Sequence, residues 1–257
     1  MTSDARIHPA ARLGSKVSVG PWSIIDADVE IGDGTWIDSH VVIRGPTRIG
    51  RNNRIYAFCS LGQDAQDKKF EPGVGPSSLV IGDDNTIREH CTINRGTAHG
   101  GGVTRVGNGN WVMACCHIAH DCQVGDHTVF ANHATLAGHV EVHDRVTLGG
   151  FTGVHQFCRV GENSFTAIAS VVVKDVPPFV VVAGNTASPR AVNRVGLQRR
   201  GLVEAEIQAI RRAFKTLYRE GLTLSAALAA LERQAQDSGH VRTMLEFVRG
   251  SQRGICR

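Results

Sequence analysis

The sequence predicts a solenoid of short parallel β-strands followed by a small helical domain. Aliphatic residues recur at every sixth position over most of the first two thirds of the chain, and the last third changes to helical spacing. A six-residue period fits neither an α-helix, with about 3.6 residues per turn, nor a simple alternating strand. It suits short flat strands that are joined at corners, each of which sends one apolar side chain inward.

The repeat begins at Ile7 and continues without a break to Leu61. Many of its aliphatic residues are followed by glycine, which lets the backbone turn sharply at little steric cost. The repeat resumes at Ile81, Ile87 and Ile93, and it runs again from Val106 to Val172 through apolar residues that include Phe130, with Thr166 as the one polar departure. The positions of the first run are Ile7, Leu13, Val19, Ile25, Ile31, Ile37, Ile43, Ile49, Ile55 and Leu61.

These hexads resemble the left-handed parallel β-helix of the hexapeptide-repeat transferases, in which three hexads form one triangular coil of about 18 residues. The left hand follows from this resemblance and not from the periodicity, since crossovers between parallel strands are usually right-handed. We therefore expect a mainly β protein, with a left-handed parallel β-helix of hexapeptide repeats over residues 1–178 and a small C-terminal α-helical domain over 179–257.

Two loops are expected where the repeat is interrupted, near 62–80 and 97–105. The first contains the charged run Gln66-Asp67-Lys68-Lys69 and returns through a segment rich in proline and glycine. Loops that leave a rigid scaffold often carry binding or catalytic residues. We therefore expect the first loop to have a functional role.

Helical spacing begins after Pro177-Pro178, which ends the repeat. A first helix is expected to end at Gly221, and Thr223 and Ser238 are suited to cap two further helices. The apolar residues of the first helix share one face, so a small bundle of three amphipathic helices is predicted. These residues are Ile207, Ile210, Phe214 and Leu217.

The bulk composition excludes several classes of protein. The formal charge of the 257 residues is +4, which is too mild to indicate a nucleic-acid partner. The first residues, Met1 to Arg6, form no apolar signal segment, and no stretch approaches 18 apolar residues. We expect a cytoplasmic protein without membrane insertion. Its 7 cysteines form no obvious disulfide framework and are expected to be reduced, packed thiols.

Five of the 12 histidines lie within two to three coils. With coils of about 18 residues, one column contains His120, Gly138 and Gln156, with steps of about 4.8 Å between coils. The adjacent column contains Asp121, His139 and Phe157. The five clustered histidines are His117, His120, His133, His139 and His155, and those in or beside these two columns form a ladder of imidazoles along one edge.

The ladder suggests acyl transfer. A neutral imidazole at His120 suits a general base, Asp121 can fix its tautomer, and a backbone N–H near Gly138 can face a developing oxyanion. Histidines that only satisfy hydrogen bonds on the surface are one alternative. A zinc site, as in the hexapeptide-repeat carbonic anhydrases, is another; its candidate ligands match no structural zinc pattern, so no metal is expected. Those ligands are Cys116, His117, His120 and Cys122.

Longer motifs resemble one specific family. The segments His117–Cys122, Leu136–Val140, Val154–Cys158, Asp175–Pro178 and Gly196–Gly201 are similar to those of the acyl-carrier-protein-dependent UDP-N-acetylglucosamine O-acyltransferases, which begin lipid A biosynthesis. The resemblance covers nearly the whole chain, including the Gln66–Lys69 segment and the helical tail. Together these motifs are far more specific than a hexapeptide repeat alone.

The resemblance implies transfer of an (R)-3-hydroxyacyl group from the phosphopantetheine of acyl carrier protein to the glucosamine 3-hydroxyl of UDP-N-acetylglucosamine. It implies a homotrimer with sites between subunits, and neither metal nor cofactor. His120 would be the general base, Asp121 its support, and the Gly138 amide the oxyanion donor. The implied substrate-binding residues are Gln66, Asp67, Lys69, His117, His139, His155, Gln156, Asn193, Arg199 and Arg200, the last three at the nucleotide end.

Two positions depart from the family pattern. Val195 replaces an acidic residue that relatives often carry near the ribose, which puts that contact in doubt. Ile168 occupies the position that limits the acyl pocket, where a small residue admits a long chain. A bulky branched residue should shorten the pocket, so a preference for donors of about ten carbons over fourteen is predicted.

Two other functions stay open from the sequence. One is N-acyl transfer to an analogue of the sugar nucleotide that has an amine at the 3-position. The other is a non-catalytic paralogue that binds sugar nucleotide, against which the intact His120, Asp121 and Gly138 argue.

Overall fold

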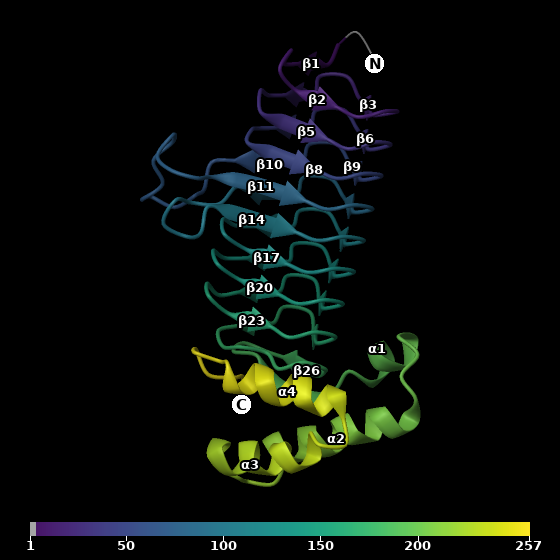
Figure 1. The fold of residues 1–257 in the computed structure, drawn as a ribbon, viewed down its shortest axis with the longest axis vertical. Helices are drawn as coiled ribbons and strands as arrows, with labels where there is room; N and C mark the ends of the chain where they lie inside the picture. The colour runs from purple at the N-terminus through teal and green to yellow at the C-terminus, as the bar shows by residue number, and fades with distance from the viewer. Residues whose placement is uncertain (1–3) are drawn as a thin grey trace.

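A computed structural model describes residues 4–257, and most of it is a stack of coils with three parallel sheets as its sides (Figure 1). Sheet 1 contains β1 (Arg6–Ile7), β4 (Ile24–Ile25), β7 (Val42–Ile43), β10 (Ser60–Gln63), β13 (Thr92–Asn94), β16 (His117–Ile118), β19 (Thr135–Leu136), β22 (Gly153–Val154) and β25 (Val171–Val172). Sheet 2 contains β2 (Arg12–Leu13), β5 (Val29–Ile31), β8 (Thr47–Ile49), β11 (Ser78–Ile81), β14 (Val103–Val106), β17 (Gln123–Val124), β20 (Glu141–Val142) and β23 (Arg159–Val160). Sheet 3 contains β3 (Ser18–Val19), β6 (Trp36–Ile37), β9 (Arg54–Ile55), β12 (Thr86–Ile87), β15 (Trp111–Val112), β18 (Val129–Phe130), β21 (Thr147–Leu148), β24 (Phe165–Thr166), β26 (Val180–Ala183) and β27 (Ser188–Val192).

The chain visits the three sheets in turn, so each coil has three corners. We call the turns from sheet 1 to sheet 2 corner 1–2, those from sheet 2 to sheet 3 corner 2–3, and those from sheet 3 back to sheet 1 corner 3–1. The register stacks equivalent residues, since Ile118 pairs with Leu136 and Leu136 with Val154. Each corner is therefore a column of equivalent turns.

The interior of the coils is a continuous apolar column. The residues at the six-residue positions point inward, and Ile37, Ile43, Ile55 and Leu61 have no exposed surface. Truncating one such side chain to alanine costs about 2–5 kcal/mol. All seven cysteines are free thiols, and every one except Cys115 is buried.

Corner 2–3 is held by polar side chains that bind the backbone of the neighbouring coil. Asp126 Oδ1 accepts from the Asn108 N–H at 2.7 Å, and Asp144 Oδ1 accepts from the Asp126 N–H at 2.9 Å. Deeper inside, Asn85 Oδ1 accepts from the Asn110 N–H at 2.9 Å. These side chains take the place of hydrogen bonds that the short strands do not make.

The strands extend beyond the predicted division at residue 178. β26 pairs in parallel with β24, and β27 returns antiparallel to β26, so the segment 179–257 begins with strands and not with helix. The predicted helical spacing applies only from Arg194 onward, because Pro177-Pro178 ends the hexads without ending the sheet.

The helical part comprises α1 (Arg194–Arg199), α2 (Glu204–Tyr218), α3 (Leu224–Gln234) and α4 (Gly239–Arg249). Thr223 and Ser238 accept hydrogen bonds from backbone amides of α3 and α4 as N-caps. The apolar face of α2 is buried, and it packs against α3, α4 and β27. None of the helices in residues 4–257 combines the length and the apolar character that crossing a bilayer requires.

Candidate active site

Both insertions leave the β-helix at corner 1–2. Residues 64–77 join β10 to β11 and residues 95–102 join β13 to β14, and the two loops project from the same side of the stack (Figure 1). They bind each other, since Ser77 Oγ donates to the Gly96 carbonyl at 2.6 Å and the Gly96 N–H donates to the Ser78 carbonyl at 3.0 Å. The loops thus form a wall beside the coils that follow.

His120 and Asp121 lie at corner 1–2 between β16 and β17. His120 Nδ1 is 2.8 Å from Asp121 Oδ2. The Asp121 side chain is fully buried, and its carboxylate also accepts from the Thr97 N–H at 2.9 Å and from Thr97 Oγ1 at 2.7 Å. Because an ionised carboxylate can only accept, we assign the proton of His120 to Nδ1, which leaves Nε2 free to accept one.

Asp121 is charged in spite of its burial. Loss of solvent opposes ionisation, but the hydrogen bonds from His120 and Thr97 outweigh it, so the pKa of this carboxyl lies below its ordinary value. The backbone of Asp121 is left-handed, with φ of 62°, a conformation that aspartate tolerates better than most residues. Its N–H donates to Thr104 Oγ1 at 2.8 Å, which fixes the turn.

Two glycines leave no space for a side chain against His120 and Asp121. A Cβ atom at Gly138 would lie 2.6 Å from His120 Cε1 and 2.7 Å from Nε2, and one at Gly100 would overlap the Asp121 carboxylate. Gly100 belongs to the second insertion, which therefore covers Asp121. The Gly138 N–H has no acceptor among residues 4–257, so it can donate to a bound ligand.

Two further histidines of the ladder are near His120. The rings of His120 and His139 meet edge to face with centroids 5.1 Å apart, and His139 Nε2 is 3.9 Å from Asp121 Oδ2. His117 Nδ1 is 2.7 Å from Thr92 Oγ1. Burial lowers the pKa of both His117 and His139, so both rings are neutral at neutral pH.

The first insertion contacts the second through Asp67. Its Oδ2 is 3.2 Å from His99 Nε2, and its Oδ1 accepts from the Lys69 N–H at 3.0 Å. The hydrogen bond from the Lys69 backbone is the main cause that lowers the pKa of Asp67. The side chains of Gln66 and Lys69 are exposed, as substrate-binding groups would be.

A cavity of about 690 Å³ lies at this corner and includes residues that the sequence analysis missed. Asp121, His139 and Gly100 line it together with Arg159 and Arg253. Gly100 comes from an insertion outside the register of the coils, and Arg253 from the C-terminal end of the chain. Neither carried a signal in the spacing of the hexads.

The other predicted residues lie at other corners of the same chain. Asn193 caps α1 and donates to the Asn163 carbonyl at 2.8 Å, and Arg200 pairs with Glu162 at 3.7 Å, both at corner 2–3. Arg199 is in the last turn of α1, and α1 lies on the side of the stack away from the insertions (Figure 1). Ile168 lies at corner 3–1 and is 72% exposed. One chain therefore does not bring these groups to His120.

His155 and Gln156 are exposed at corner 1–2, one coil beyond His139. Phe157 of the same turn stacks on the His139 ring with centroids 4.5 Å apart. His120, Gly138 and Gln156 therefore occupy the same place in three successive turns of corner 1–2, as the 18-residue spacing predicts.

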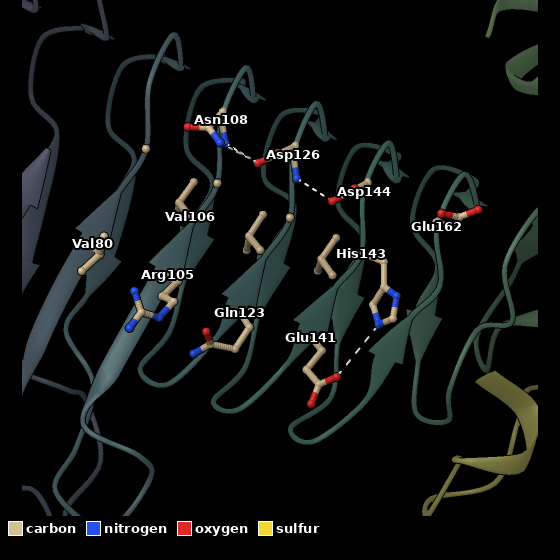
Figure 2. A pocket seen from close by; sticks show the side chains of 15 residues that line it. Val80, Arg105, Val106, Asn108, Gln123, Asp126, Glu141, His143, Asp144 and Glu162 are labelled. Carbon is tan, nitrogen blue, oxygen red and sulfur yellow. Dashed lines mark hydrogen bonds and ion pairs between the residues drawn. The ribbon is translucent and has the colours of Figure 1, made fainter. Parts of the chain in front are cut away.

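A groove of similar volume, about 690 Å³, follows the outer face of sheet 2 (Figure 2). Arg105, Gln123 and Glu141 project into it from successive strands. Its other margin is the column of Asn108, Asp126 and Asp144, whose side-chain oxygens accept from the backbone amides of Asp83, Asn108 and Asp126. Gln123 and Glu141 line both spaces, so the groove continues from the cavity at corner 1–2.

Among residues 4–257, His120, Asp121 and His139 are the one group whose side chains could converge on a metal ion, with ligand atoms within 4.8 Å of one another. A metal on His120 Nδ1 would displace the proton that Asp121 accepts, and the 2.8 Å separation fits that hydrogen bond. The alternative set of Cys116, His117, His120 and Cys122 is not among the groups of residues 4–257 whose ligand atoms lie close enough to share a metal ion.

Family comparison assigns both parts of the chain. Residues 175–256 match the family model described as Udp N-acetylglucosamine O-acyltransferase, Domain 2, and residues 28–63 and 104–138 match the bacterial transferase hexapeptide repeats. Two curated relatives are acyl-[acyl-carrier-protein]–UDP-N-acetylglucosamine O-acyltransferases. That of Thiobacillus denitrificans is 52% identical over 98% of this chain and 97% of its own, and that of Halorhodospira halophila is 54% identical over 99% and 98%.

Solved structures agree over the whole chain. The UDP-N-acetylglucosamine acyltransferase of Francisella novicida is 40% identical, covers 100% of this chain and 93% of its own, and superposes with a TM-score of 0.97. The enzyme of Campylobacter jejuni is 40% identical, with coverage of 99% and 98% and a TM-score of 0.94. The predicted fold class, a left-handed parallel β-helix of hexapeptide repeats followed by helices, is confirmed.

Proposed function

The chain belongs to the family of acyl-carrier-protein-dependent UDP-N-acetylglucosamine O-acyltransferases, and from this premise we propose that His120 is the general base of the transfer. The protein is an acyltransferase of the first step of lipid A biosynthesis. In the proposed reaction, an (R)-3-hydroxyacyl group passes from the phosphopantetheine thioester of acyl carrier protein to the glucosamine 3-hydroxyl of UDP-N-acetylglucosamine.

The observation that carries the proposal is the hydrogen bond of 2.8 Å between His120 Nδ1 and Asp121 Oδ2. It leaves His120 Nε2 as the proton acceptor. As the sugar oxygen attacks the thioester carbon, Nε2 takes the hydroxyl proton, and the buried carboxylate of Asp121 stabilises the imidazolium that forms. General-base catalysis of this kind contributes about 10²–10⁴-fold to the rate.

Gly138 is proposed to bind the oxyanion of the tetrahedral intermediate. Its N–H is unpaired within residues 4–257, and its lack of a side chain lets it lie against the His120 ring. When the intermediate collapses, the C–S bond breaks, and His120 returns its proton to the departing thiolate. Asp121 keeps its charge throughout, and no covalent enzyme intermediate forms.

The remaining predicted residues are assigned to binding. Asp67, Lys69 and Gln66 are proposed to contact the sugar and acyl groups, with His117, His139, His155 and Gln156. Arg199 and Arg200 would bind the diphosphate, for which the planar guanidinium offers paired donors. The Asn193 side chain already caps α1, so its proposed role includes fixing the start of the helix that ends at Arg199 and is followed by Arg200.

A homotrimer is proposed because one chain separates the two ends of this site. His120 lies at corner 1–2, whereas Arg200 and Ile168 lie at the other two corners. Corner 3–1 also carries exposed aromatic rings, among them Trp22, Phe58 and Phe151, which a neighbouring copy would cover. Size measurement by light scattering tests this assembly, and a monomer with full activity would contradict it.

Acyl carrier protein is the proposed macromolecular partner, in line with the donor named for the relatives. Arg211, Arg212 and Lys215 of α2 line a hollow of about 540 Å³ together with Arg190 and Arg194. Of these five cations Arg194 pairs with Glu204 at 3.3 Å, and the excess of positive charge that remains attracts an acidic protein. We propose this face of α2 as the entry side for the carrier protein, and the sequence-based expectation of a cytoplasmic reaction fits a donor of that kind.

The deciding experiment is product formation by the purified protein with UDP-N-acetylglucosamine and 3-hydroxyacyl carrier proteins of several lengths. His120→Ala should lose about 10²–10⁴-fold in rate while keeping its fold. Full activity of this variant would contradict the assignment of the base. The same assay after treatment with a chelator tests the proposed independence from metals and cofactors, and undiminished activity is expected.

Ile168 is proposed to limit the length of the acyl chain. If it does, the wild-type protein should prefer donors of about ten carbons, and Ile168→Gly should shift the preference toward fourteen carbons by roughly 10–100-fold. An unshifted preference would exclude Ile168 as the determinant. Product with a 3-amino acceptor, but none with UDP-N-acetylglucosamine, would instead indicate N-acyl transfer.

A further inference from the structure

The C-terminal tail, residues 250–257, returns to corner 1–2 and is held there by Asp175. This residue is 1% exposed. Its Oδ2 accepts from Ser251 Oγ at 2.7 Å and its Oδ1 from the Arg159 N–H at 2.8 Å. Its own backbone N–H and carbonyl bind the Gly254 carbonyl at 3.0 Å and the Cys256 N–H at 2.8 Å. The tail is therefore fixed on both sides of Arg253.

Arg253 reaches from this tail to a histidine of the ladder. Its Nη2 lies 3.3 Å from His155 Nδ1. A guanidinium has five donors and no acceptor, and it stays protonated in proteins. The contact is a hydrogen bond only if Nδ1 of His155 is unprotonated, so that a neutral ring carries its proton on Nε2.

A second partner favours the opposite tautomer. The Gln156 carbonyl lies 3.2 Å from the same His155 Nδ1, and a carbonyl can only accept. A neutral His155 can satisfy Arg253 or Gln156 through Nδ1, but not both. The presence of Arg253 therefore decides whether the free nitrogen, Nε2, is a donor or an acceptor.

The other arginine of the cavity is engaged elsewhere. Arg159 Nε donates to Glu141 at 3.2 Å, and its guanidinium lies over the Phe247 ring at 4.5 Å. Arg253, in contrast, forms no ion pair with a carboxylate of residues 4–257. Besides His155, its guanidinium has the Cys158 thiol as a side-chain partner, which is a weak acceptor and does not compete for His155 Nδ1.

We propose that Arg253 is a positioning residue that holds His155 in the tautomer with the proton on Nε2, which makes the exposed face of His155 a hydrogen-bond donor to the substrate. The inference rests on the proposed function only in assigning that donor to the acyl-transfer substrates. Asp175 has a supporting role, because it fixes the tail from which Arg253 extends.

The first test measures the tautomer without any substrate. The ¹⁵N resonances of the His155 ring are recorded by NMR in the full-length protein and assigned by their absence in His155→Ala. The wild-type protein should show a proton on Nε2, and Arg253→Met should move it to Nδ1, toward Gln156. Arg253→Lys keeps one donor and should retain the wild-type tautomer. An Nδ1 proton in the wild type, or no change in Arg253→Met, would overturn the proposal.

The second test separates this role from a structural one. Arg253→Met should raise KM about tenfold, as expected for the loss of about one hydrogen bond, with little change in kcat. Arg233→Met, which removes an exposed arginine from α3, should leave KM unchanged. The thermal midpoint should be the same in all three proteins. An unchanged KM in Arg253→Met would contradict the role toward substrate, whereas a wild-type protein without transferase activity would contradict the proposed function and leave the NMR result to decide the tautomer.

Discussion

Corners 1–2 and 2–3 use the same residue type, a carboxylate in a turn, with different results. Asp126 at corner 2–3 accepts from the Asn108 N–H at 2.7 Å, and Asp121 at corner 1–2 accepts from the Thr97 N–H at 2.9 Å. Both therefore tie one coil to the chain before it. Asp121 differs in two respects: an imidazole donates to it, and the loop 95–102 covers it.

The comparison suggests how a structural position gains a chemical role. Corner 2–3 has no long insertion, and the side-chain oxygens of Asn108, Asp126 and Asp144 there are bound by backbone amides. At corner 1–2 the insertion shields the carboxylate from water, so its charge is stabilised by fixed donors and directed at one histidine. Asp121 is thus a residue that ties two coils together and, in the proposed mechanism, also the partner of the general base His120.

The largest expected effect is on the activity of Asp121→Asn, which should fall far below that of Asp126→Asn. In Asp121→Asn, one amide oxygen replaces a carboxylate that accepts from three donors, and the amide NH₂ cannot accept the His120 Nδ1 proton. The ring is then driven to the wrong tautomer. We expect kcat to fall by up to about 10⁴-fold, as judged from the effect of the equivalent change in other His–Asp pairs.

Asp126→Asn is the matched control, because it removes the charge of a carboxylate that also joins two segments of the stack and that makes no contact with His120. The asparagine oxygen can still accept from the Asn108 N–H, as Asn108 itself does from Asp83. Acyl transfer should stay within about twofold of wild type. Equal losses in Asp121→Asn and Asp126→Asn would mean that the two corners do not differ in the way we describe.

The second largest effect is expected from filling the space between Gly138 and His120. The added methyl group of Gly138→Ala would lie 2.6 Å from His120 Cε1, so the ring must move away from its position over the Gly138 amide. A loss of about 10²-fold in kcat is expected. Gly153→Ala serves as the control, since nothing lies within 4 Å of the added Cβ and activity should be retained. Wild-type rates in Gly138→Ala would remove Gly138 from the mechanism.

A substitution at corner 2–3 should lower the free energy of unfolding and leave the activity unchanged. Asn85→Ala deprives the Asn110 N–H and the Gly107 carbonyl of their partners in the buried interior. Leaving such groups unsatisfied costs about 2 kcal/mol or more in the free energy of unfolding, which urea denaturation measures. Transfer at saturating substrate should be unaffected. A loss of activity without a loss of stability would show that corner 2–3 acts on the chemistry after all.

The hexads predict far more of the fold than of the site. Inward-facing aliphatic side chains impose the period, so the strands and the stacking of His120 over Gly138 follow from counting. Thr97 and Arg253 could not be found in this way, because an insertion shifts one out of register and the other arrives from the end of the chain. The strands β26 and β27 were missed for a related reason: their pairing depends on the last coil, not on the six-residue period.

The smallest effect is an acid dependence that belongs to corner 1–2. The pKa of Asp121 lies below its ordinary value of 3.8, because the hydrogen bonds from His120 and Thr97 outweigh the cost of burial. A carboxyl with a lowered native pKa contributes stability that is complete above the ordinary value and is lost as the pH falls through the native one. The difference in unfolding free energy between the wild type and Asp121→Asn should therefore be constant above about pH 5 and shrink below pH 3.8.

Thr97→Val sharpens this test, because it removes one hydroxyl donor and leaves the backbone donor and His120 in place. The native pKa of Asp121 should then lie closer to its ordinary value. The pH range over which stability is lost should end at a higher pH than in the wild type, as measured by urea denaturation across an acid series. If the free energy of unfolding depends on pH in the same way in the wild type, Thr97→Val and Asp121→Asn, the donors at corner 1–2 do not stabilise the charge of Asp121. Asp121 would then only join segments of the stack, as Asp126 does.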